Sequence, residues 1–426
     1  SEELQNLYLP KLISGEWTGT MNLTEPQAGS DVGALTSKAE LQVDGTYKIS
    51  GQKIFITWGE HDVAENICHL VLARLPNGKP GPKGISLFLV PKFIPNSDGS
   101  LGARNDLRCV SLENKLGIHG SPTAVMEFSK ATGWLVGQEH NGMACMFTMM
   151  NNARLAVGMQ GVGVAEGAYQ HALAYAMDRK QGRAMIAEGT GSIIDHADVR
   201  RMLAQMKSEI FAARSIGVAC AVAIDMARTT GDVDWLARAA FLTPIAKSFG
   251  SDTGVAVADL GVQIHGGMGF VEETAAAQYL RDVRITPIYE GTNGIQAMDL
   301  VARKMMDGGV AAFRLMDDIT DLASNSKSEL ADAVLASVTE LRATTEWLLN
   351  HDLNDRFAGA VAYQKAFARV LGGYFHLISA MSGDGKRVRI ANFYINNLLP
   401  EYTALCSQAR VGSENLYALE LDDFAA

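Results

Sequence analysis

Cysteine is scarce and unpaired in this 426-residue sequence. The five cysteines, Cys68, Cys109, Cys145, Cys220 and Cys406, are widely separated and form no C-x-x-C motif. This spacing argues against a disulfide framework and is typical of a protein kept in a reducing compartment, so we expect a cytoplasmic location. The nine histidines form neither an H-x-x-x-H nor an H-E-x-x-H pattern, and we therefore expect no metal site.

Positive charge is also in short supply. Lys and Arg number 37 against 47 Asp and Glu, a net charge of -10, which argues against general binding to nucleic acid or to an anionic membrane. The sequence does not start with a charged stretch followed by an apolar run, so we expect no signal peptide. It also has no uninterrupted apolar run of membrane length, so we expect no membrane span. With 47% hydrophobic residues, the chain is large enough for two or three domains with a substantial core.

The character of the sequence changes along the chain. Residues 1–20 have a Leu-rich pattern typical of the end of a helical segment. From residue 21 to about 133, short alternating or β-branched runs are separated by turn signals such as Asp44-Gly45. This pattern predicts a compact β domain, with strands at 47–49, 54–57, 69–72 and 85–90.

From residue 134 onward the pattern is helical. Gly158, Gly161, Ala165, Ala168 and Ala172 recur at three- and four-residue spacing, which gives one helix a small-residue face for close packing. Further helices at about 195–229, 233–261 and 272–281, with the segment after residue 290, predict a bundle of four long helices that ends near residue 307. Residues 308–426 continue as an additional helical region, with fifteen acidic and ten basic residues and so a net charge of -5.

Glu290 has the setting most suggestive of chemistry. It stands before Gly291, between an apolar approach at 285–288 and a helix that resumes at about Ile295. Pro287 predicts an extended conformation for the approach. A carboxylate in an apolar cleft has its charged form disfavoured and can act as a base near neutral pH. An acid that merely suits the dipole of the following helix is the alternative.

Three other segments have the residues to surround a planar, phosphate-bearing molecule. Phe55 and Thr57 fall on one face of a predicted strand, where they can flank a heterocycle or form an ordinary core pair. Gly266 and Gly267 permit close backbone approach to a phosphate, or simply end a helix. The loop at 24–31, rich in Pro, Gly and Ser, exposes N–H groups and hydroxyls, but alone it is an ordinary turn.

Taken in order, these segments resemble the acyl-CoA dehydrogenase family of flavoenzymes. The family signatures T-E-P-x-A-G-S-D, K-x-[WF]-I-T, Q-x-x-G-G-x-G-[FY] and R-D-x-x-x-x-x-I-Y-E-G-T match residues 24–31, 53–57, 263–270 and 281–292. The resemblance implies an α+β fold with a middle β domain (21–133), a C-terminal four-helix bundle (134–307) and an extra C-terminal helical domain (308–426). It also implies FAD and the oxidation of an acyl-CoA thioester to its trans-2-enoyl product. Electron-transfer flavoprotein is the implied electron acceptor, and a homodimer or larger assembly is expected.

The resemblance also implies roles for individual residues. Glu290 matches the base that removes the α-hydrogen while the β-hydrogen leaves as hydride to the flavin. Cofactor-binding positions are matched by Leu23, Thr24, Ser30, Phe55, Thr57, Arg179, Gln263, Gly266, Gly267, Thr292 and Gln296. Among these, Arg179 matches an arginine that reaches the FAD of a neighbouring subunit. Substrate-binding positions are matched by Ser30, Arg154 and Gly291.

Two departures refine the resemblance. The family has a long helical domain before the loop at 24–31, whereas only residues 1–20 precede it here, so we expect this chain to be truncated or a fragment that retains a remnant of that domain. Residues 115–122 and 194–200 are similar to the branch of the family that oxidises 3-methylmercaptopropionyl-CoA to methylthioacryloyl-CoA in dimethylsulfoniopropionate breakdown. The sequence therefore favours this sulfur-containing substrate.

Other functions of the same fold stay open. A fatty acyl-CoA dehydrogenase of straight chains would share every signature, and an acyl-CoA oxidase would differ in letting oxygen reach the reduced flavin. An alkylation-response-type flavoprotein would bind DNA through a basic C-terminal extension, but residues 308–426 are acidic on balance. We accordingly expect an acyl-CoA substrate and no nucleic acid or membrane partner.

Overall fold

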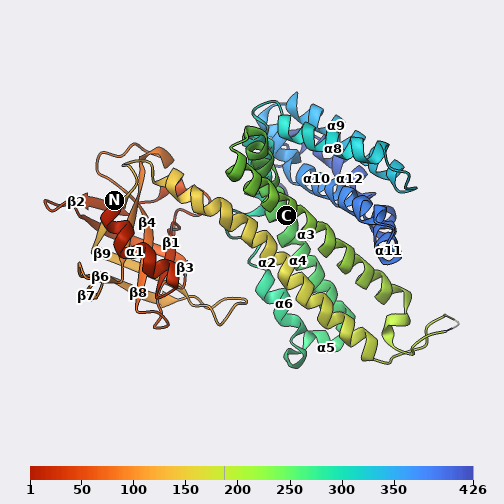
Figure 1. Cartoon of the computed structure of the whole chain (residues 1–426), viewed down its shortest axis with the longest axis horizontal. Helices are drawn as coiled ribbons and strands as arrows, with labels where there is room; N and C mark the ends of the chain where they lie inside the picture. The colour runs from red at the N-terminus through yellow and green to blue at the C-terminus, as the bar shows by residue number, and fades with distance from the viewer. Residues whose placement is uncertain (187, 426) are drawn as a thin grey trace. The chain divides into compact units, whose positions relative to one another are not determined.

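The computed structural model describes residues 1–186 and 188–425. The chain divides into two compact units, Ser1–Asn151 and Asn152–Ala426 (Figure 1). The first unit is mostly β structure and the second is helical, which agrees with the α+β architecture expected from the sequence.

Seven strands of the first unit form one sheet in the order β1-β4-β2-β3-β9-β5, with β8 paired to β9. Because β5 also pairs with β4, the run from β4 to β5 closes on itself as a barrel. The strands are β1 (Trp17–Asn22), β2 (Lys38–Leu41), β3 (Tyr47–Thr57), β4 (Asn66–Arg74), β5 (Ile85–Pro91), β8 (Leu107–Leu112) and β9 (Thr123–Val136). A separate two-stranded sheet joins β6 (Phe93–Pro95) and β7 (Leu101–Arg104). The four runs expected at 47–49, 54–57, 69–72 and 85–90 all lie in strands.

The helical pattern at the start of the chain ends earlier than expected. Helix α1 (Glu2–Ser14) stops at Gly15, which has φ 82°. Residues from Trp17 onward form β1, which pairs in parallel with β4. Trp17 is buried against Tyr8, with ring centroids 5.6 Å apart. The aromatic contact and the left-handed glycine therefore turn the chain from helix into sheet.

Three long helices dominate the second unit: α2 (Gly142–Asp178), whose first residues belong to the first unit, α3 (Ala197–Thr230) and α4 (Val233–His265). They run beside one another (Figure 1). The small-residue face expected on α2 lies against α4, because a Cβ at Gly158 would collide with the carbonyl of Ala246 and one at Gly161 with that of Gly250. The stripe is thus used for close helix packing.

The fourth position of the bundle is filled by shorter helices than the sequence indicated. Helix α6 (Ala276–Val283) packs into the same core as α2, α3 and α4, and α7 (Asn293–Val301) follows it. The expectation of an extended segment at 285–288 is wrong, since these residues form turns in which the Thr286 N–H donates to Val283 and the Ile288 N–H to Ile285. Pro287 prevents a continuing helix, but the buried Thr286 satisfies its polar groups locally.

The region after residue 308 is helical, as expected, and shares one apolar core with α3, α4 and α7. Its longer helices are α8 (Val310–Ser324), α9 (Ala331–Leu349), α10 (Leu353–Met381), α11 (Gly385–Phe393) and α12 (Glu401–Ala409). Short segments α5 (Gly267–Phe270), α13 (Glu414–Tyr417) and α14 (Leu421–Ala425) complete the described α-helices, and a π-helix at Tyr394–Leu398 follows α11. Phe367 of α10 packs on Phe241 of α4 with ring centroids 5.0 Å apart.

One helix among the described residues, α3, is long and apolar enough to cross a membrane by length and composition. No membrane-length apolar run was expected from the sequence, because charged residues interrupt this helix. Buried residues of α3 pack against α4 and α10 in the helical core. A core helix of a bundle has the same composition, so this feature is weak evidence for a membrane span.

Candidate active site

Glu290 lies in a strained loop between α6 and α7. Its φ is 57°, and that of Gly291 is 82°, so two consecutive residues adopt the left-handed conformation. For a residue with a side chain this costs roughly 1–2 kcal/mol. The Thr292 hydroxyl caps α7 by accepting from the Ile295 N–H at 3.3 Å, which fixes where the helix begins. Strain of this kind, at a carboxylate held by its surroundings, is typical of a functional position.

The Glu290 carboxylate is set for proton transfer. Its Oε2 is buried without a hydrogen-bond partner among residues 1–186 and 188–425. Burial raises the pKa of Glu290 above its usual range, while the positive charges of Arg154 and Lys247 oppose the shift. A carboxylate with a raised pKa and a free lone pair is a suitable general base near neutral pH.

The loop that carries Glu290 is held by Gln296 of α7, whose side chain is fully buried. Its Nε2 donates to the Glu290 carbonyl at 3.3 Å, and a Cβ at Gly291 would collide with the same nitrogen. On the other side, the Tyr289 hydroxyl donates to Gln160 of α2. Gln296 was predicted to contact a cofactor. Its Oε1 is buried without a hydrogen-bond partner among the described residues, and the cofactor role stays a prediction.

Phe55 in the β unit is exposed and backbone-strained. One extra residue lies on β3 between the pairs Lys53–Met126 and Ile56–Ala124, a β-bulge. At this bulge Phe55 has φ 59° and is 60% exposed, and Trp58 nearby has φ 55° and is also exposed. Thr57, which lies between them in the sequence, is also exposed. Two exposed aromatic residues and an exposed hydroxyl within four positions of the chain are suited to binding a planar polar molecule.

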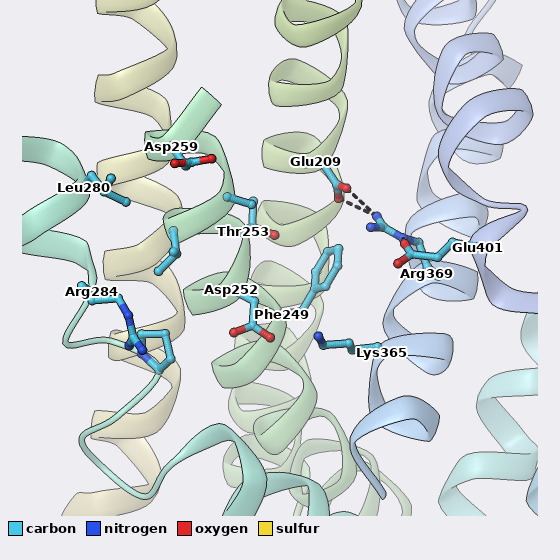
Figure 2. A pocket seen from close by; sticks show the side chains of 13 residues that line it. Glu209, Phe249, Asp252, Thr253, Asp259, Leu280, Arg284, Lys365, Arg369 and Glu401 are labelled. Carbon is cyan, nitrogen blue, oxygen red and sulfur yellow. Dashed lines mark hydrogen bonds and ion pairs between the residues drawn. The ribbon is translucent and has the colours of Figure 1, made fainter. Parts of the chain in front are cut away.

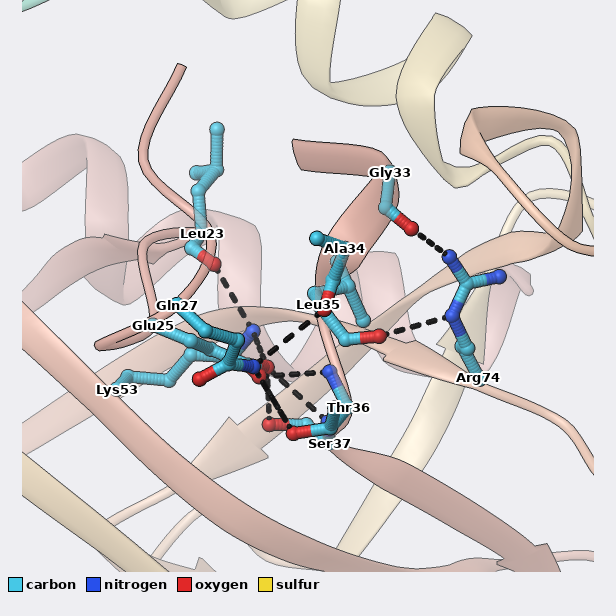
Figure 3. A network of polar contacts seen from close by, with 10 residues as sticks. All are labelled: Leu23, Glu25, Gln27, Gly33, Ala34, Leu35, Thr36, Ser37, Lys53 and Arg74. Carbon is cyan, nitrogen blue, oxygen red and sulfur yellow. Dashed lines mark hydrogen bonds and ion pairs between the residues drawn. The ribbon is translucent and has the colours of Figure 1, made fainter. Parts of the chain in front are cut away.

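A buried ion pair between Lys53 and Glu25 holds the segment around Leu23 against β3 (Figure 3). The Lys53 Nζ donates to Glu25 Oε1 at 2.8 Å and to the Leu23 carbonyl at 3.0 Å, and both charged side chains are buried. The Ile54 N–H donates to the Thr24 carbonyl at 3.0 Å. Leu23 and Thr24 are therefore fixed beside the strand that carries Phe55, and their contact with a flavin stays a prediction.

The sequence interpretation missed the structural part played by Glu25 and Lys53. Glu25 also accepts from the N–H and hydroxyl groups of Thr36 and Ser37, at 2.6 to 3.1 Å. These bonds and Lys53 outweigh the effect of burial and lower the pKa of Glu25 to about 2. The sequence offered no signal for this pair, because simple alternation puts Lys53 on the same strand face as Phe55 and Thr57. The bulge after Lys53 separates the buried lysine from those exposed residues.

The remaining predicted residues fall in separate places. Ser30 is exposed in the loop after Glu25. Arg154 on α2 is 8% exposed and acts electrostatically on Glu290. Arg179, Gln263, Gly266 and Gly267 are exposed near the far ends of α2 and α4.

Contacts between α2 and α4 locate this second group. His265 stacks on Tyr175, with ring centroids 4.4 Å apart, one turn before Arg179. Arg154 and Tyr175 are 21 residues apart on α2, which at 1.5 Å per residue is roughly 30 Å. The second unit thus carries two distinct groups of predicted residues, one around Glu290 and one at the opposite end of the bundle.

Three family models match nearly the whole chain. Residues 20–131 match the acyl-CoA dehydrogenase middle domain, and residues 140–306 match the acyl-CoA dehydrogenase C-terminal domain. Residues 313–420 match the acetyl-CoA dehydrogenase C-terminal-like domain. The order of the matches follows the β unit, the bundle and the added helices.

Individual relatives agree with these matches. The chain is 47% identical to the 3-methylmercaptopropionyl-CoA dehydrogenase of Ruegeria pomeroyi, over 91% of this chain and 68% of the relative. It is 37% identical to a butyryl-CoA dehydrogenase of Syntrophomonas wolfei, over 94% and 72%. The fold is similar to that of an acyl-CoA dehydrogenase complexed with FAD from Bacillus anthracis, with a TM-score of 0.77 and 22% identity over all of this chain and 73% of that one. This chain belongs to the acyl-CoA dehydrogenase family.

Proposed function

We propose that this chain is an FAD-dependent dehydrogenase that oxidises an acyl-CoA thioester between its α and β carbons to the trans-2-enoyl-CoA. The observation that carries the proposal is the buried Glu290 carboxylate, which has an unpartnered oxygen and a raised pKa. A thioester α-proton is weakly acidic, so its removal needs a base shielded from water and fixed in place. The bonds from Gln296 and Tyr289 provide that fixation.

The β unit has a surface that fits FAD. Phe55 and Trp58 are exposed aromatic residues, Thr57 is an exposed hydroxyl residue of the same segment, and Lys53 holds the Leu23 carbonyl beside this strand. These residues would hold the isoalloxazine ring by stacking and by hydrogen bonds to its edge. FAD, when bound, supplies the acceptor for the β-hydrogen as hydride.

In this mechanism the chain's own residues handle the proton and the developing charge. Glu290 accepts the α-proton on its free oxygen, and the backbone N–H of the base loop donates to the thioester oxygen as negative charge develops there. The positive charges of Arg154 and Lys247 favour the ionised carboxylate and partly offset the rise that burial causes in its pKa. Closing the site against water would leave the base desolvated, which strengthens each of these interactions.

We further propose 3-methylmercaptopropionyl-CoA as the substrate, with methylthioacryloyl-CoA as the product of a step in dimethylsulfoniopropionate breakdown. The 47% identity to the Ruegeria pomeroyi enzyme supports this choice. A straight-chain substrate is the alternative, supported by the 37% identity to a butyryl-CoA dehydrogenase. The acidic balance of residues 308–426 argues against the DNA-binding alternative.

The separation of the two residue groups on the bundle supports a homodimer or larger assembly. One of these groups lies at the end of α2 and α4 opposite Glu290 and consists of Arg179, Gln263, Gly266 and Gly267. In an assembly these residues would contact the FAD held by a neighbouring subunit. We propose electron-transfer flavoprotein as the electron acceptor and the cytoplasm as the location. Sedimentation of the FAD-loaded protein as a monomer would contradict the shared site.

The deciding experiment is anaerobic bleaching of the bound flavin by a panel of acyl-CoA thioesters. The panel contains 3-methylmercaptopropionyl-CoA, butyryl-CoA and longer straight chains. We expect the flavin absorbance near 450 nm to fall fastest with the sulfur substrate, with an enoyl product identified by mass spectrometry. Faster bleaching by butyryl-CoA would select the straight-chain alternative, and no bleaching by any member would contradict dehydrogenase activity.

A further inference from the structure

Lys247 on α4 is a fully buried lysine that contacts the loop of the proposed base. None of its surface is exposed, and its Nζ donates to Asn293 Oδ1 at 2.8 Å. Asn293 is the first residue of α7 and follows Glu290 by three positions. Burying an ammonium group is costly unless it is paired, so the identity of its partners indicates what it does.

Asn293 extends this contact to an acid. Its Nδ2 donates to Asp252 Oδ1 at 2.7 Å and to Ser251 Oγ at 3.0 Å. Because its amide oxygen faces an ammonium and its amide nitrogen a carboxylate, the side chain has one satisfied orientation. Asp252 lies on the wall of a cavity of about 540 Å³, with Lys365 also in the lining (Figure 2). The network therefore runs from the cavity wall to the start of α7.

The charges of Lys247 and Glu290 are coupled. Burial lowers the pKa of Lys247 to about 8, while the negative charges of Asp252 and Glu290 support its protonated form. In return, Lys247 opposes the rise that burial causes in the pKa of Glu290. At neutral pH the ammonium thus remains charged and favours the ionised base.

Other charged groups around Glu290 come from the neighbouring elements. Arg154 on α2 interacts electrostatically with Asp299 of α7. Asp299 also forms an ion pair with Arg303. Tyr289 adjoins the base and is raised in pKa, mainly by burial, so it stays neutral near pH 7. Lys247 lies among these charges and is hydrogen-bonded to Asn293, the first residue of the helix that follows the base.

We propose that Lys247 is a positioning residue for Glu290: through Asn293 it fixes the start of α7, and its charge keeps the Glu290 carboxylate ready to accept a proton. This inference rests on the proposed function. A lysine that served packing alone would stabilise the bundle without influencing the pH at which the base works. The two roles therefore differ in a measurable pH profile.

The test isolates proton removal from hydride transfer. The FAD-loaded protein is incubated in D₂O with an acyl-CoA analogue in which sulfur replaces the β-carbon, so that the α-proton can exchange but no β-hydrogen can leave. NMR gives the exchange rate as a function of pH for the wild type, Lys247→Met and Asn293→Ala. Ser251→Ala is the matched control, because it removes a neutral bond to the same Asn293. Flavin content and the unfolding temperature are recorded for each variant.

We expect Lys247→Met to move the exchange midpoint upward by about one pH unit or more, while Ser251→Ala keeps the wild-type midpoint. Asn293→Ala retains the ammonium, so we expect a rate at least about tenfold lower with a smaller midpoint change. Wild-type exchange with an unchanged midpoint in Lys247→Met overturns the inference. If Lys247→Met does not fold, a wild-type rate in Asn293→Ala overturns it. Neither exchange nor bleaching in the wild type would instead contradict the proposed function.

Discussion

Lys53 lies fully buried in β3 with its ammonium 2.8 Å from Glu25, and the same ammonium holds the Leu23 carbonyl at 3.0 Å. One side chain thus links an acid to the backbone of the segment proposed to meet the flavin. A buried ion pair adds little net stability to a protein compared with a pair of apolar side chains. Removing only one of the two charges, however, strongly destabilises the protein. The value of the pair therefore lies in fixing the loop geometry.

We predict that Lys53→Met destabilises the protein by about 3–5 kcal/mol, because it leaves the Glu25 carboxylate buried without its cation. The free energy of unfolding is measured by urea titration. Lys48→Met is the matched control, since Lys48 lies on the same strand and bonds only a threonine hydroxyl among the described residues. We expect that control to cost less than about 1 kcal/mol. Equal losses in both variants would show that the buried pair has no special role.

Glu25 also predicts a pH dependence of stability. Its pKa falls from 4.5 to about 2 on folding, so the stabilisation is fully present above pH 4.5 and is lost as the pH falls towards 2. The shift corresponds to about 3 kcal/mol. Urea titrations at pH 6 and pH 2.5 should therefore show a smaller loss of stability for Glu25→Gln than for the wild type. Equal losses would show that Glu25 has an ordinary pKa in the folded protein.

Much of the fold was predictable because it depends on local patterns. The alternation around Tyr47 and the glycine stripe around Gly158 each reflect one period of secondary structure, and both predictions are confirmed. The turns around Pro287 were not predictable, because they depend on where Thr286 finds its acceptor after packing. Hydrogen bonds between distant residues, such as that of Lys247 with Asn293, likewise follow only from the tertiary fold.

The site shows the same division. Motif resemblance selected Glu290 and Phe55, and the structure adds their positive φ values, which a sequence pattern does not reveal. The predicted roles of individual residues remain predictions. For Gln296 the motif suggests cofactor contact, and the structure adds a hydrogen bond from its Nε2 to the Glu290 carbonyl.

Gly291→Ala is predicted to disrupt the base loop. At φ 82° an alanine is strained, and its Cβ would collide with Gln296 Nε2. We expect a loss of about 1–2 kcal/mol in stability and a fall of at least about tenfold in flavin bleaching, because the base moves. Gly294→Ala, three residues along in α7, is the control, since its Cβ meets only Thr292 Oγ1 at 3.9 Å. Unimpaired bleaching by Gly291→Ala would show that the loop tolerates a different backbone conformation.

Phe55→Gly is predicted to weaken FAD binding and to stabilise the β unit. Glycine adopts φ 59° without strain, so relief of the left-handed backbone should stabilise the β unit by up to about 1 kcal/mol. The aromatic surface is lost at the same time, so FAD should dissociate at least about tenfold more readily. Lys130→Gly is the control, because Lys130 is also exposed, with φ 64° on β9. It should gain similar stability and keep FAD affinity, measured by fluorescence titration; equal FAD affinity in both variants would remove Phe55 from the flavin site.

Glu290→Gln is predicted to retain FAD and to slow anaerobic bleaching by about 100- to 10,000-fold, the usual contribution of a general base. In the wild type, the pKa of Glu290 is raised by burial, so the bleaching rate should fall as the pH drops through that raised value and the carboxylate becomes protonated. The glutamine has no proton to gain or lose there, so its residual rate should not follow the same curve. Stopped-flow absorbance from pH 5 to 8 measures both profiles. A Glu290→Gln variant that bleaches at the wild-type rate, with the wild-type pH dependence, would assign the base to another residue.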